Sequence, residues 1–293
     1  LNVRNLEERT ALICAIRGGQ TDTAQLLIEN GADVNVRDVE KWSPLLWAIY
    51  KRQTYTARLL MEKGADPNIK SDAGWSPLIW AVYIIGDIDS SKLLIEKGAD
   101  LNIKDSEGRT ALMLAASHEN RTDISALLIE KGADLNLRGN DGWTALMWAA
   151  YIGNAATTKL LIERGADPNV KDHIGRTALI WATYENKTDS TRVLIEEGAD
   201  LNVGDQDGWC ALILAAFNGH TGTTKLLIEN GVDMKKTVSN GKNALMYAAM
   251  NNSRDLAELL IKGGINLNVR DDDGKTALIW AIKYGSTDIA KLL

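Results

Sequence analysis

The pattern of apolar and polar positions along the chain predicts paired helices. After Thr144, Leu146 and Ala149 lie three residues apart and face one side of a short helix. A second helical stretch at 157–163 stops before Gly165. The Thr144 hydroxyl can cap the first helix, and a glycine suits the left-handed residue that ends the second. We therefore predict a short helix, a longer helix and a turn-forming segment, or finger, that leads to the next cap.

This pattern recurs along the whole chain every 33 or 34 residues, as from Thr10 to Ser43 and from Ser76 to Thr110. A fixed period of this length is typical of a stacked array in which each repeat buries its apolar face against its neighbours. We predict one domain of nine repeats, numbered first to ninth: 5–37, 38–70, 71–104, 105–138, 139–171, 172–204, 205–237, 238–270 and 271–293. The predicted helix caps are Thr10, Ser43, Ser76, Thr110, Thr144, Thr177, Cys210, Asn243 and Thr276.

Two stretches of each repeat resemble those of the ankyrin-repeat family. In the fifth repeat they read Asp-Gly-Trp-Thr-Ala-Leu-Met-Trp-Ala-Ala at 141–150 and Gly-Ala-Asp-Pro-Asn at 165–169. The resemblance covers essentially the whole chain. It implies an all-α solenoid of stacked helix-turn-helix units with projecting β-turn or hairpin fingers. It also implies a binding scaffold that is not an enzyme.

Composition and charge narrow the classes of function. The chain of 293 residues has a formal net charge of -6 and a pI of about 5.3, which disfavours non-specific nucleic-acid binding. No apolar run approaches the ~20 residues of a membrane span, so we predict no membrane segment. Residues 1–4 read like the tail of a preceding finger, and Leu293 falls inside a second helix. We therefore expect the chain to be part of a longer array or protein.

The cysteine and histidine residues argue against disulfides and against catalysis. Cys14 and Cys210 lie about six repeats apart, too far to pair within a stacked array. Free thiols are typical of a reducing compartment, so we predict an intracellular, cytoplasmic location. The histidines occupy different places in their repeats, and none belongs to a pattern with metal-ligand or nucleophile spacing. We predict no catalytic residue, no metal and no cofactor.

Two local departures from the repeat are expected to affect the structure. The third and fourth repeats each carry one extra residue between their helices, in the stretches 84–87 and 118–121. We interpret each insertion as a slightly longer surface loop. Cys210 is a poor helix cap, whereas Asn243 can still cap its helix.

Aromatic side chains recur at three positions, which we name from the helix cap. The pre-cap position, immediately before the cap, holds Trp42, Trp75, Trp143 and Trp209. The plus-four position holds Trp47, Trp80, Trp148, Trp181, Tyr247 and Trp280. The plus-seven position holds Tyr50, Tyr83, Tyr151, Tyr184 and Phe217. The fourth repeat has Arg109, Leu114 and Ser117 at these positions, so the aromatic residues fall into two clusters.

Helical geometry separates these positions. At about 100° per residue, plus-seven points away from the buried Leu and Ala positions, and plus-four lies at their flank. We interpret plus-four as structural filling between first helices, and the other two positions as a binding surface on the concave wall. We expect Trp143 and Tyr151 to be substantially exposed. The predicted partner-binding residues are Trp42, Tyr50, Trp75, Tyr83, Trp143, Tyr151, Arg176, Tyr184, Trp209 and Phe217.

Charged residues accompany the aromatic positions. The pre-cap position is basic wherever it is not Trp, at Arg9, Arg109, Arg176, Lys242 and Lys275. A second basic series, two residues after the finger Asn, contains Arg4, Arg37, Lys70, Lys104, Arg138, Lys171 and Arg270. Acidic residues such as Glu40 and Asp72 lie on the finger tips. Series of mixed sign are most often solvated or mutually paired, and they would also suit a partner with charged and apolar or proline-rich segments.

These observations predict a monomeric scaffold that binds another protein or an extended peptide in an aromatic-lined groove. Two alternatives stay open. One is recognition of a small anionic or oligonucleotide ligand, with Trp stacking on bases and Arg or Lys contacting phosphates, although the acidic net charge disfavours it. The other is a passive structural spacer with no ligand in the groove.

Overall fold

The computed structural model describes residues 1–293, and most of its regular structure is helical. Contacts between residues divide the chain into an N-terminal unit, Leu1–Asp141, and a C-terminal unit, Gly142–Leu293. The N-terminal unit contains α1 (Ala11–Arg17), α2 (Thr21–Glu29), α3 (Pro44–Tyr50), α4 (Thr54–Glu62), α5 (Pro77–Ile79), η1 (Trp80–Ile85), α6 (Ile88–Glu96), α7 (Ala111–Ala116), η2 (Glu119–Arg121) and α8 (Thr122–Glu130). The C-terminal unit contains α9 (Ala145–Ile152), α10 (Ala155–Glu163), α11 (Ala178–Tyr184), α12 (Thr188–Glu196), α13 (Ala211–Phe217), α14 (Thr221–Glu229), α15 (Ala244–Met250), α16 (Arg254–Lys262), α17 (Ala277–Lys283) and α18 (Thr287–Ala290).

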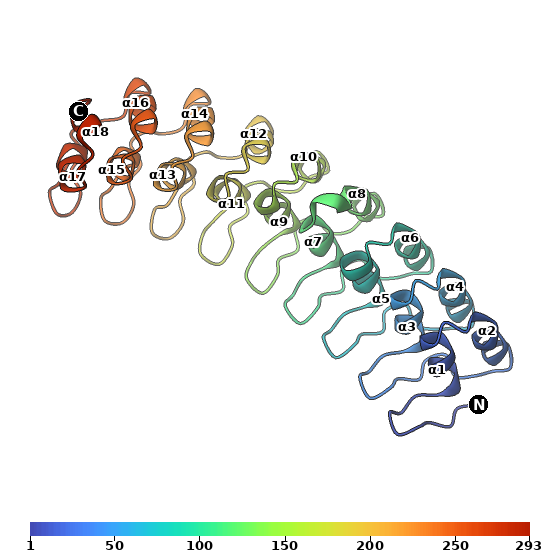
Figure 1. Cartoon of the computed structure of the whole chain (residues 1–293). Helices are drawn as coiled ribbons and strands as arrows, with labels where there is room; N and C mark the ends of the chain where they lie inside the picture. Colours follow the sequence, from blue (N-terminus) through green and yellow to red (C-terminus); the bar gives the residue numbers. More distant parts are fainter. The chain divides into compact units, whose positions relative to one another are not determined.

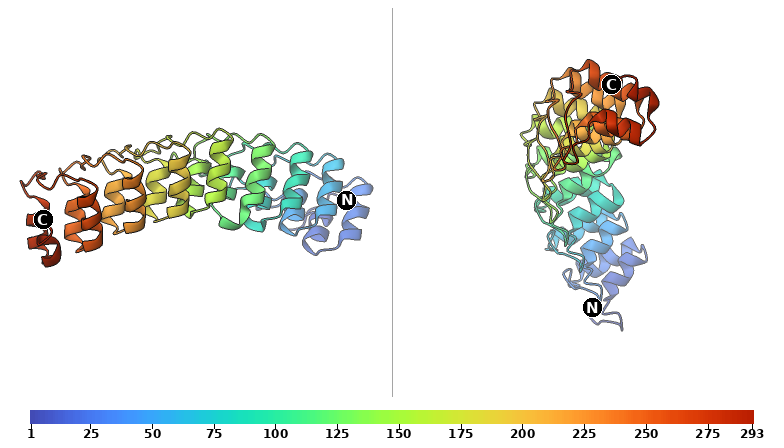
Figure 2. Two further views of the ribbon diagram at one scale, coloured as in Figure 1. Left: turned by 90° about the horizontal axis from the view of Figure 1, so that it is seen from above. Right: turned by 90° about the vertical axis from the view of Figure 1, so that its left-hand side faces the viewer.

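Within each unit, consecutive helix pairs lie side by side, and the fingers between pairs project from the stack (Figures 1 and 2). First helices pack on first helices, as α9 does on α11, and second helices on second helices, as α10 does on α12. Leu146 and Ala149, at the predicted core positions, are 1% and 0% exposed. The all-α stack is thus confirmed, whereas the division into nine repeats stays a prediction.

Helix starts and ends follow the local chemistry of the chain. The side chains of six caps accept a first-turn N–H: Thr10, Ser43, Ser76, Thr110, Thr144 and Asn243. Cys210 makes no such bond, as expected, but neither do Thr177 and Thr276, so hydroxyl capping is wrong at these two. The Thr177 hydroxyl is instead buried without a hydrogen-bond partner. The second helices end at glycines with positive φ, such as Gly165 at φ 99°, as predicted.

Side chains of the fingers join each repeat to the next. Asn35 Oδ1 accepts the backbone N–H of Asp66 in the following finger at 3.0 Å, and Asn68 Oδ1 accepts that of Asp100 at 2.8 Å. The second basic series also reaches forward, because Lys70 Nζ donates to the Lys104 carbonyl at 3.3 Å and Lys104 Nζ to that of Arg138 at 2.9 Å. These lysines therefore bond backbone carbonyls of the neighbouring finger rather than acidic side chains.

The extra residue of the third repeat is absorbed in a π-helix, η1. The Gly86 N–H bonds to the Ala81 carbonyl, five residues back, and Gly86 then turns the chain with φ 63°. The predicted longer loop is therefore wrong here: Ile84 and Ile85 continue the helix. A wider helical turn keeps the backbone groups of the added residue paired, which an open loop at this place would not do. In the fourth repeat the inserted stretch contains the short 3₁₀ helix η2.

Arg121, at the end of η2, joins the two insertions. Its Nη1 donates to the carbonyls of Val82 and Tyr83 in η1. In some other repeats the residue before the second helix bonds one carbonyl of the preceding repeat, as Gln53 Nε2 does to Ile16 O at 2.7 Å and the Ser286 hydroxyl to Ala249 O at 2.7 Å. The two insertions therefore form one structural feature: η1 presents two carbonyls, and η2 supplies the cation that binds both.

Candidate functional site

The pre-cap tryptophans Trp42 and Trp143 each bridge two consecutive repeats. The Trp42 ring lies 4.5 Å from Trp47 of its own repeat and 4.6 Å from Trp80 of the next. Trp143 lies 4.6 Å from Trp148 and 4.7 Å from Trp181 in the same way. The pre-cap rings are half-buried by these contacts. Pre-cap and plus-four residues thus alternate in a run of stacked rings in the second and third repeats, and in another run in the fifth and sixth.

The plus-seven rings stand edge-on against the pre-cap indoles. Tyr50 meets Trp42 at 5.5 Å and 87°, and Tyr83 meets Trp75 at 5.5 Å and 88°. This T-shaped geometry is a favoured arrangement of aromatic pairs. Three plus-seven side chains are exposed, Tyr50 (42%), Tyr184 (39%) and Phe217 (44%). The outward direction that helical geometry assigns to this position therefore holds at these residues.

Trp143 and Tyr151 are half-buried, so the expectation that both are substantially exposed is wrong. The next repeat covers them, because Trp181 lies 4.7 Å from Trp143 and 6.0 Å from Tyr151. The negative charge of Glu185, then burial, and a hydrogen bond to the same carboxylate raise the pKa of Tyr151. Helical geometry gives the direction of a side chain from its own helix and cannot show what the neighbouring repeat places over it.

Three of the plus-four indoles, those of Trp47, Trp181 and Trp280, are anchored by aspartates that the sequence analysis did not single out. These aspartates lie five residues before the cap, a place we call the finger-base position. Trp47 Nε1 donates to Asp38 Oδ2 at 3.0 Å, and Trp280 Nε1 donates to Asp271 Oδ2 at 2.8 Å. The sequence contains a pattern that could have identified them, an Asp nine residues before a plus-four Trp, as in these two pairs.

The finger-base carboxylate also organises its finger. Asp38 Oδ1 accepts the backbone N–H groups of Glu40 at 3.1 Å and Trp42 at 2.9 Å. At the equivalent Asp271, burial raises the pKa of the carboxyl, but hydrogen bonds from the Lys275 backbone and the Trp280 indole, with nearby Lys242, lower it below its ordinary value overall. The carboxylate is therefore held in its charged form at the base of the finger.

Basic pre-cap residues take the place of tryptophan in the ring stack. The Arg176 guanidinium lies 4.9 Å over the Trp181 ring, and its Nε is 3.0 Å from Asp205 Oδ2 of the next repeat. Lys242 Nζ lies 5.0 Å over Trp280 and 3.8 Å from Asp271. The face of an indole ring is electrostatically negative. It therefore attracts a cation as well as the positive edge of a second ring. Arg176, predicted to bind a partner, is thus engaged within the chain.

The fourth repeat ends the first run of rings. Leu114 is buried at its plus-four position, and Arg109 pairs with Asp105 at 2.9 Å and Glu107 at 2.8 Å. We define the N-terminal cluster as Trp42, Trp47, Tyr50, Trp75, Trp80 and Tyr83. The C-terminal cluster comprises Trp143, Trp148, Tyr151, Arg176, Trp181 and Tyr184. Trp209 and Phe217, at 5.3 Å, form a further pair beside Tyr247.

The family model for ankyrin repeats matches residues 1–71, 39–105, 78–172, 151–238 and 222–293. The chain belongs to the ankyrin-repeat family. Ankyrin repeats are generally protein–protein interaction scaffolds, and members of the family are typically not enzymes. A comparison with curated proteins gives no match. None of the helices has the length and apolar character that a bilayer crossing requires.

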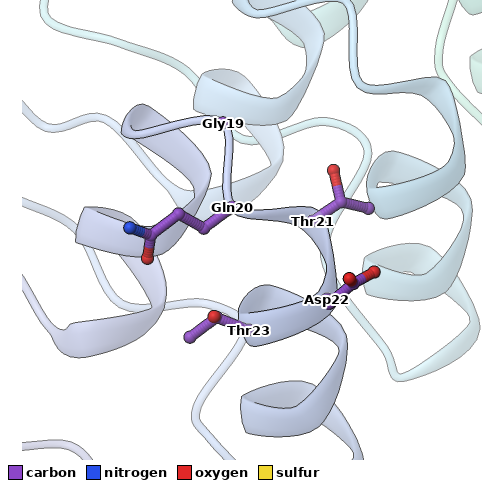
Figure 3. Close-up of a pocket in the computed structure, with 5 residues that line it drawn as sticks. All are labelled: Gly19, Gln20, Thr21, Asp22 and Thr23. Atoms are coloured by element: carbon purple, nitrogen blue, oxygen red, sulfur yellow. The ribbon is translucent and has the colours of Figure 1, made fainter.

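A hollow of about 380 Å³ lies at the turn between α1 and α2 of this ankyrin array and is lined by Gly19, Gln20, Thr21, Asp22 and Thr23. Figure 3 shows that these side chains point in different directions around the turn and do not converge on one point. No ring of the aromatic clusters lines it. The aromatic clusters, with their periodic ring contacts, are therefore the better candidate for a functional surface.

Proposed function

We propose that the aromatic clusters form a surface that binds another protein or an extended peptide. The observation that carries this proposal is the exposure of plus-seven rings, at Tyr50 in the N-terminal unit and at Tyr184 and Phe217 in the C-terminal unit. Exposed aromatic side chains with few rotatable bonds are typical interface anchors, because they offer large contact areas at a low entropic cost. A plain scaffold position on the outer side of a helix needs no aromatic residue.

The rings are also held in place before any partner arrives. Tyr50 contacts both Trp42 and Trp80, at 5.5 and 5.8 Å, and Phe217 contacts both Trp209 and Tyr247, at 5.3 and 5.4 Å. Side chains fixed in this way lose little freedom on binding, which favours affinity. This support applies equally to protein and peptide partners.

Recognition of nucleic-acid bases is less well supported. A base stacks on an open aromatic face, but Trp42 and Trp143 each lie between two other rings. The cation at Arg176, which would have to meet a phosphate, is paired with Asp205 at 3.0 Å. These contacts add to the net charge of -6 in favouring a protein ligand.

The test is a selection of random dodecapeptides displayed against the full chain. The comparison protein carries Tyr50→Ser, Tyr184→Ser and Phe217→Ser together, and the control carries Tyr55→Ser, a tyrosine of α4 that is 54% exposed. We expect selected peptides to bind the triple variant at least about tenfold more weakly and the control unchanged, as for loss of interface hot spots. If no selected peptide distinguishes the triple variant from wild type, the array is a spacer or binds elsewhere, and the proposal fails.

A further inference from the structure

The N-terminal cluster contains two equivalent ring pairs in consecutive repeats. Trp42 with Tyr50 and Trp75 with Tyr83 have the same centroid distance, 5.5 Å, and nearly the same angle, 87° and 88°. Each pair forms a corner between a half-buried indole and a tyrosine, which is exposed at Tyr50 and half-buried at Tyr83, where His118 lies 5.1 Å away. A ligand that lies along the first helices of this unit would meet the same corner twice.

The spacing of the two pairs is limited by the ring between them. Trp80 lies 4.6 Å from Trp42 and 4.8 Å from Trp75, so these two indoles are separated by at most the sum of the two distances, about 9.4 Å. A polyproline II helix has three residues per turn and a rise of ~3.1 Å per residue, or about 9.3 Å per turn. Side chains on one side of a β-strand repeat at about 6.8 Å instead. The limit of 9.4 Å by itself admits both repeats. Packed helices lie about 8–10 Å apart, so equivalent indoles of consecutive first helices have about that spacing, which one turn of polyproline II matches and the same-side repeat of a strand does not.

Unused hydrogen-bond donors of the protein favour a ligand in polyproline II conformation over an α-helical ligand. The indole N–H groups of Trp42 and Trp75 bond no acceptor within the chain, whereas that of Trp47 donates to Asp38 at 3.0 Å. Trp42 and Trp75 are half-buried beside the exposed face, so a ligand can approach their edges. The carbonyls of a polyproline II segment have no internal partners, while those of an α-helix are already bonded.

The C-terminal cluster lacks a second complete pair. Its next pre-cap residue is Arg176, which is bound to Asp205 at 3.0 Å. The Tyr151 hydroxyl is also engaged, by the Glu185 carboxylate. The two clusters therefore present different surfaces, although each is built from the same kind of ring contacts.

We infer that the N-terminal cluster binds a proline-rich segment in polyproline II conformation, with residues i and i+3 seated against Trp42/Tyr50 and Trp75/Tyr83. This inference rests on the proposed function, because it names the ligand class of the same surface. Such a segment suits the site because it brings free carbonyls to both indoles and has little conformational freedom to lose on binding.

The probe is fluorescein-labelled decaproline, and the reference is a Gly-Ser decapeptide with the same label. Fluorescence anisotropy measures their binding to the full chain. The first variant, Trp75→Arg, reproduces at the third repeat the cation that Arg176 places over Trp181 at 4.9 Å. The second variant, Trp75→Phe, keeps a ring against Trp80 and removes only the N–H donor. Circular dichroism checks that both variants fold.

We expect wild type to bind decaproline more tightly than the Gly-Ser probe. Trp75→Arg should weaken decaproline binding about tenfold or more, and Trp75→Phe about fivefold, the effect of one lost hydrogen bond. Equal decaproline binding by wild type and both variants, or equal binding of the two probes, overturns the inference. If the displayed peptides depend on the exposed rings but decaproline shows no preference, the inference fails and the proposed function stands. If no displayed peptide depends on them, the proposed function itself fails.

Discussion

The third and sixth repeats have similar ring contacts but different polar residues at the finger-base position. The pre-cap indole of the preceding repeat lies 4.6 Å from Trp80 in one and 4.7 Å from Trp181 in the other. In the sixth repeat, the finger-base residue Asp172 accepts the Trp181 indole N–H at 2.9 Å. The third repeat has Ser71 there, and both the Ser71 hydroxyl and the Trp80 indole N–H are buried without partners.

This difference separates two contributions that the sixth repeat combines, ring packing and a carboxylate acceptor. The ring distances barely change when the carboxylate is absent, so packing between repeats sets the stack. The carboxylate instead supplies acceptors for polar groups that the stack buries. At Asp172 these are the Trp181 indole and the backbone N–H groups of Ile174 at 3.0 Å and Arg176 at 2.8 Å.

The largest effect should come from the apolar core that both repeats share. Leu78→Ala and Leu179→Ala remove side chains that are each 1% exposed, and each should cost about 2–5 kcal/mol of unfolding free energy. Leu278→Ala is the matched control, because the same place in the ninth repeat is 38% exposed and should cost much less. Urea denaturation followed by circular dichroism measures all three. Equal losses would contradict the assignment of Leu278 to an uncovered face.

Removing the carboxylate should make the sixth repeat resemble the third. Asp172→Ser leaves a buried indole N–H and two backbone N–H groups without their acceptor, so we expect a loss of about 2–3 kcal/mol. The tryptophan fluorescence of the folded protein should keep its stacked environment, because packing sets the ring distances. A loss below 0.5 kcal/mol, roughly the smallest value for one hydrogen bond, would show that water replaces the carboxylate without cost.

The joined insertions occur in the N-terminal unit, and Arg121 is their key contact. Arg121→Ala leaves the Val82 and Tyr83 carbonyls without the guanidinium, and we expect it to destabilise the array by about 1.5–2 kcal/mol. Arg121→Lys should recover part of this loss, since one ammonium can reach a carbonyl but lacks the fork that serves two. Hydrogen exchange of the η1 amides reports the local effect. Unchanged exchange in Arg121→Ala would mean that η1 is stable without this contact.

Supplying the missing carboxylate should stabilise the third repeat. Ser71→Asp offers acceptors to the Trp80 indole and to the finger backbone, as Asp172 does, and we expect a gain of about 1 kcal/mol in urea denaturation. Ser71→Ala is the control and should be nearly neutral, because the serine hydroxyl has no partner to lose. If Ser71→Asp destabilises the array, the finger-base position of this repeat cannot hold a charge.

The smallest effect concerns acid stability. Because the folded pKa of Asp271 lies below the ordinary value of 3.8, its carboxylate contributes stability above that pH and loses it as the pH falls through the folded pKa. We expect Asp271→Asn to lower stability at pH 7 and to narrow the difference between urea midpoints at pH 7 and pH 3. An unchanged difference would show that other carboxylates control acid unfolding.

Much of the site could be predicted from sequence, but not the contacts that define it. The plus-seven direction follows from helical geometry, and Tyr50, Tyr184 and Phe217 are exposed accordingly. The half-burial of Trp143 could not be predicted, because it depends on Trp181 in the next repeat. The engagement of Arg176 by Asp205 likewise needs the relative placement of two fingers.

The stack of paired helices, the glycines that end the second helices and the residues of the aromatic clusters all follow from the sequence alone. These features are local or periodic: a cap, a positive φ and a helical face need only a few neighbouring residues. Tertiary structure alone decided that the extra residue of the third repeat enters a π-helix and that Arg121 binds its carbonyls. Arg121 lies 39 and 38 residues from the Val82 and Tyr83 carbonyls, and only packing between repeats brings such groups together.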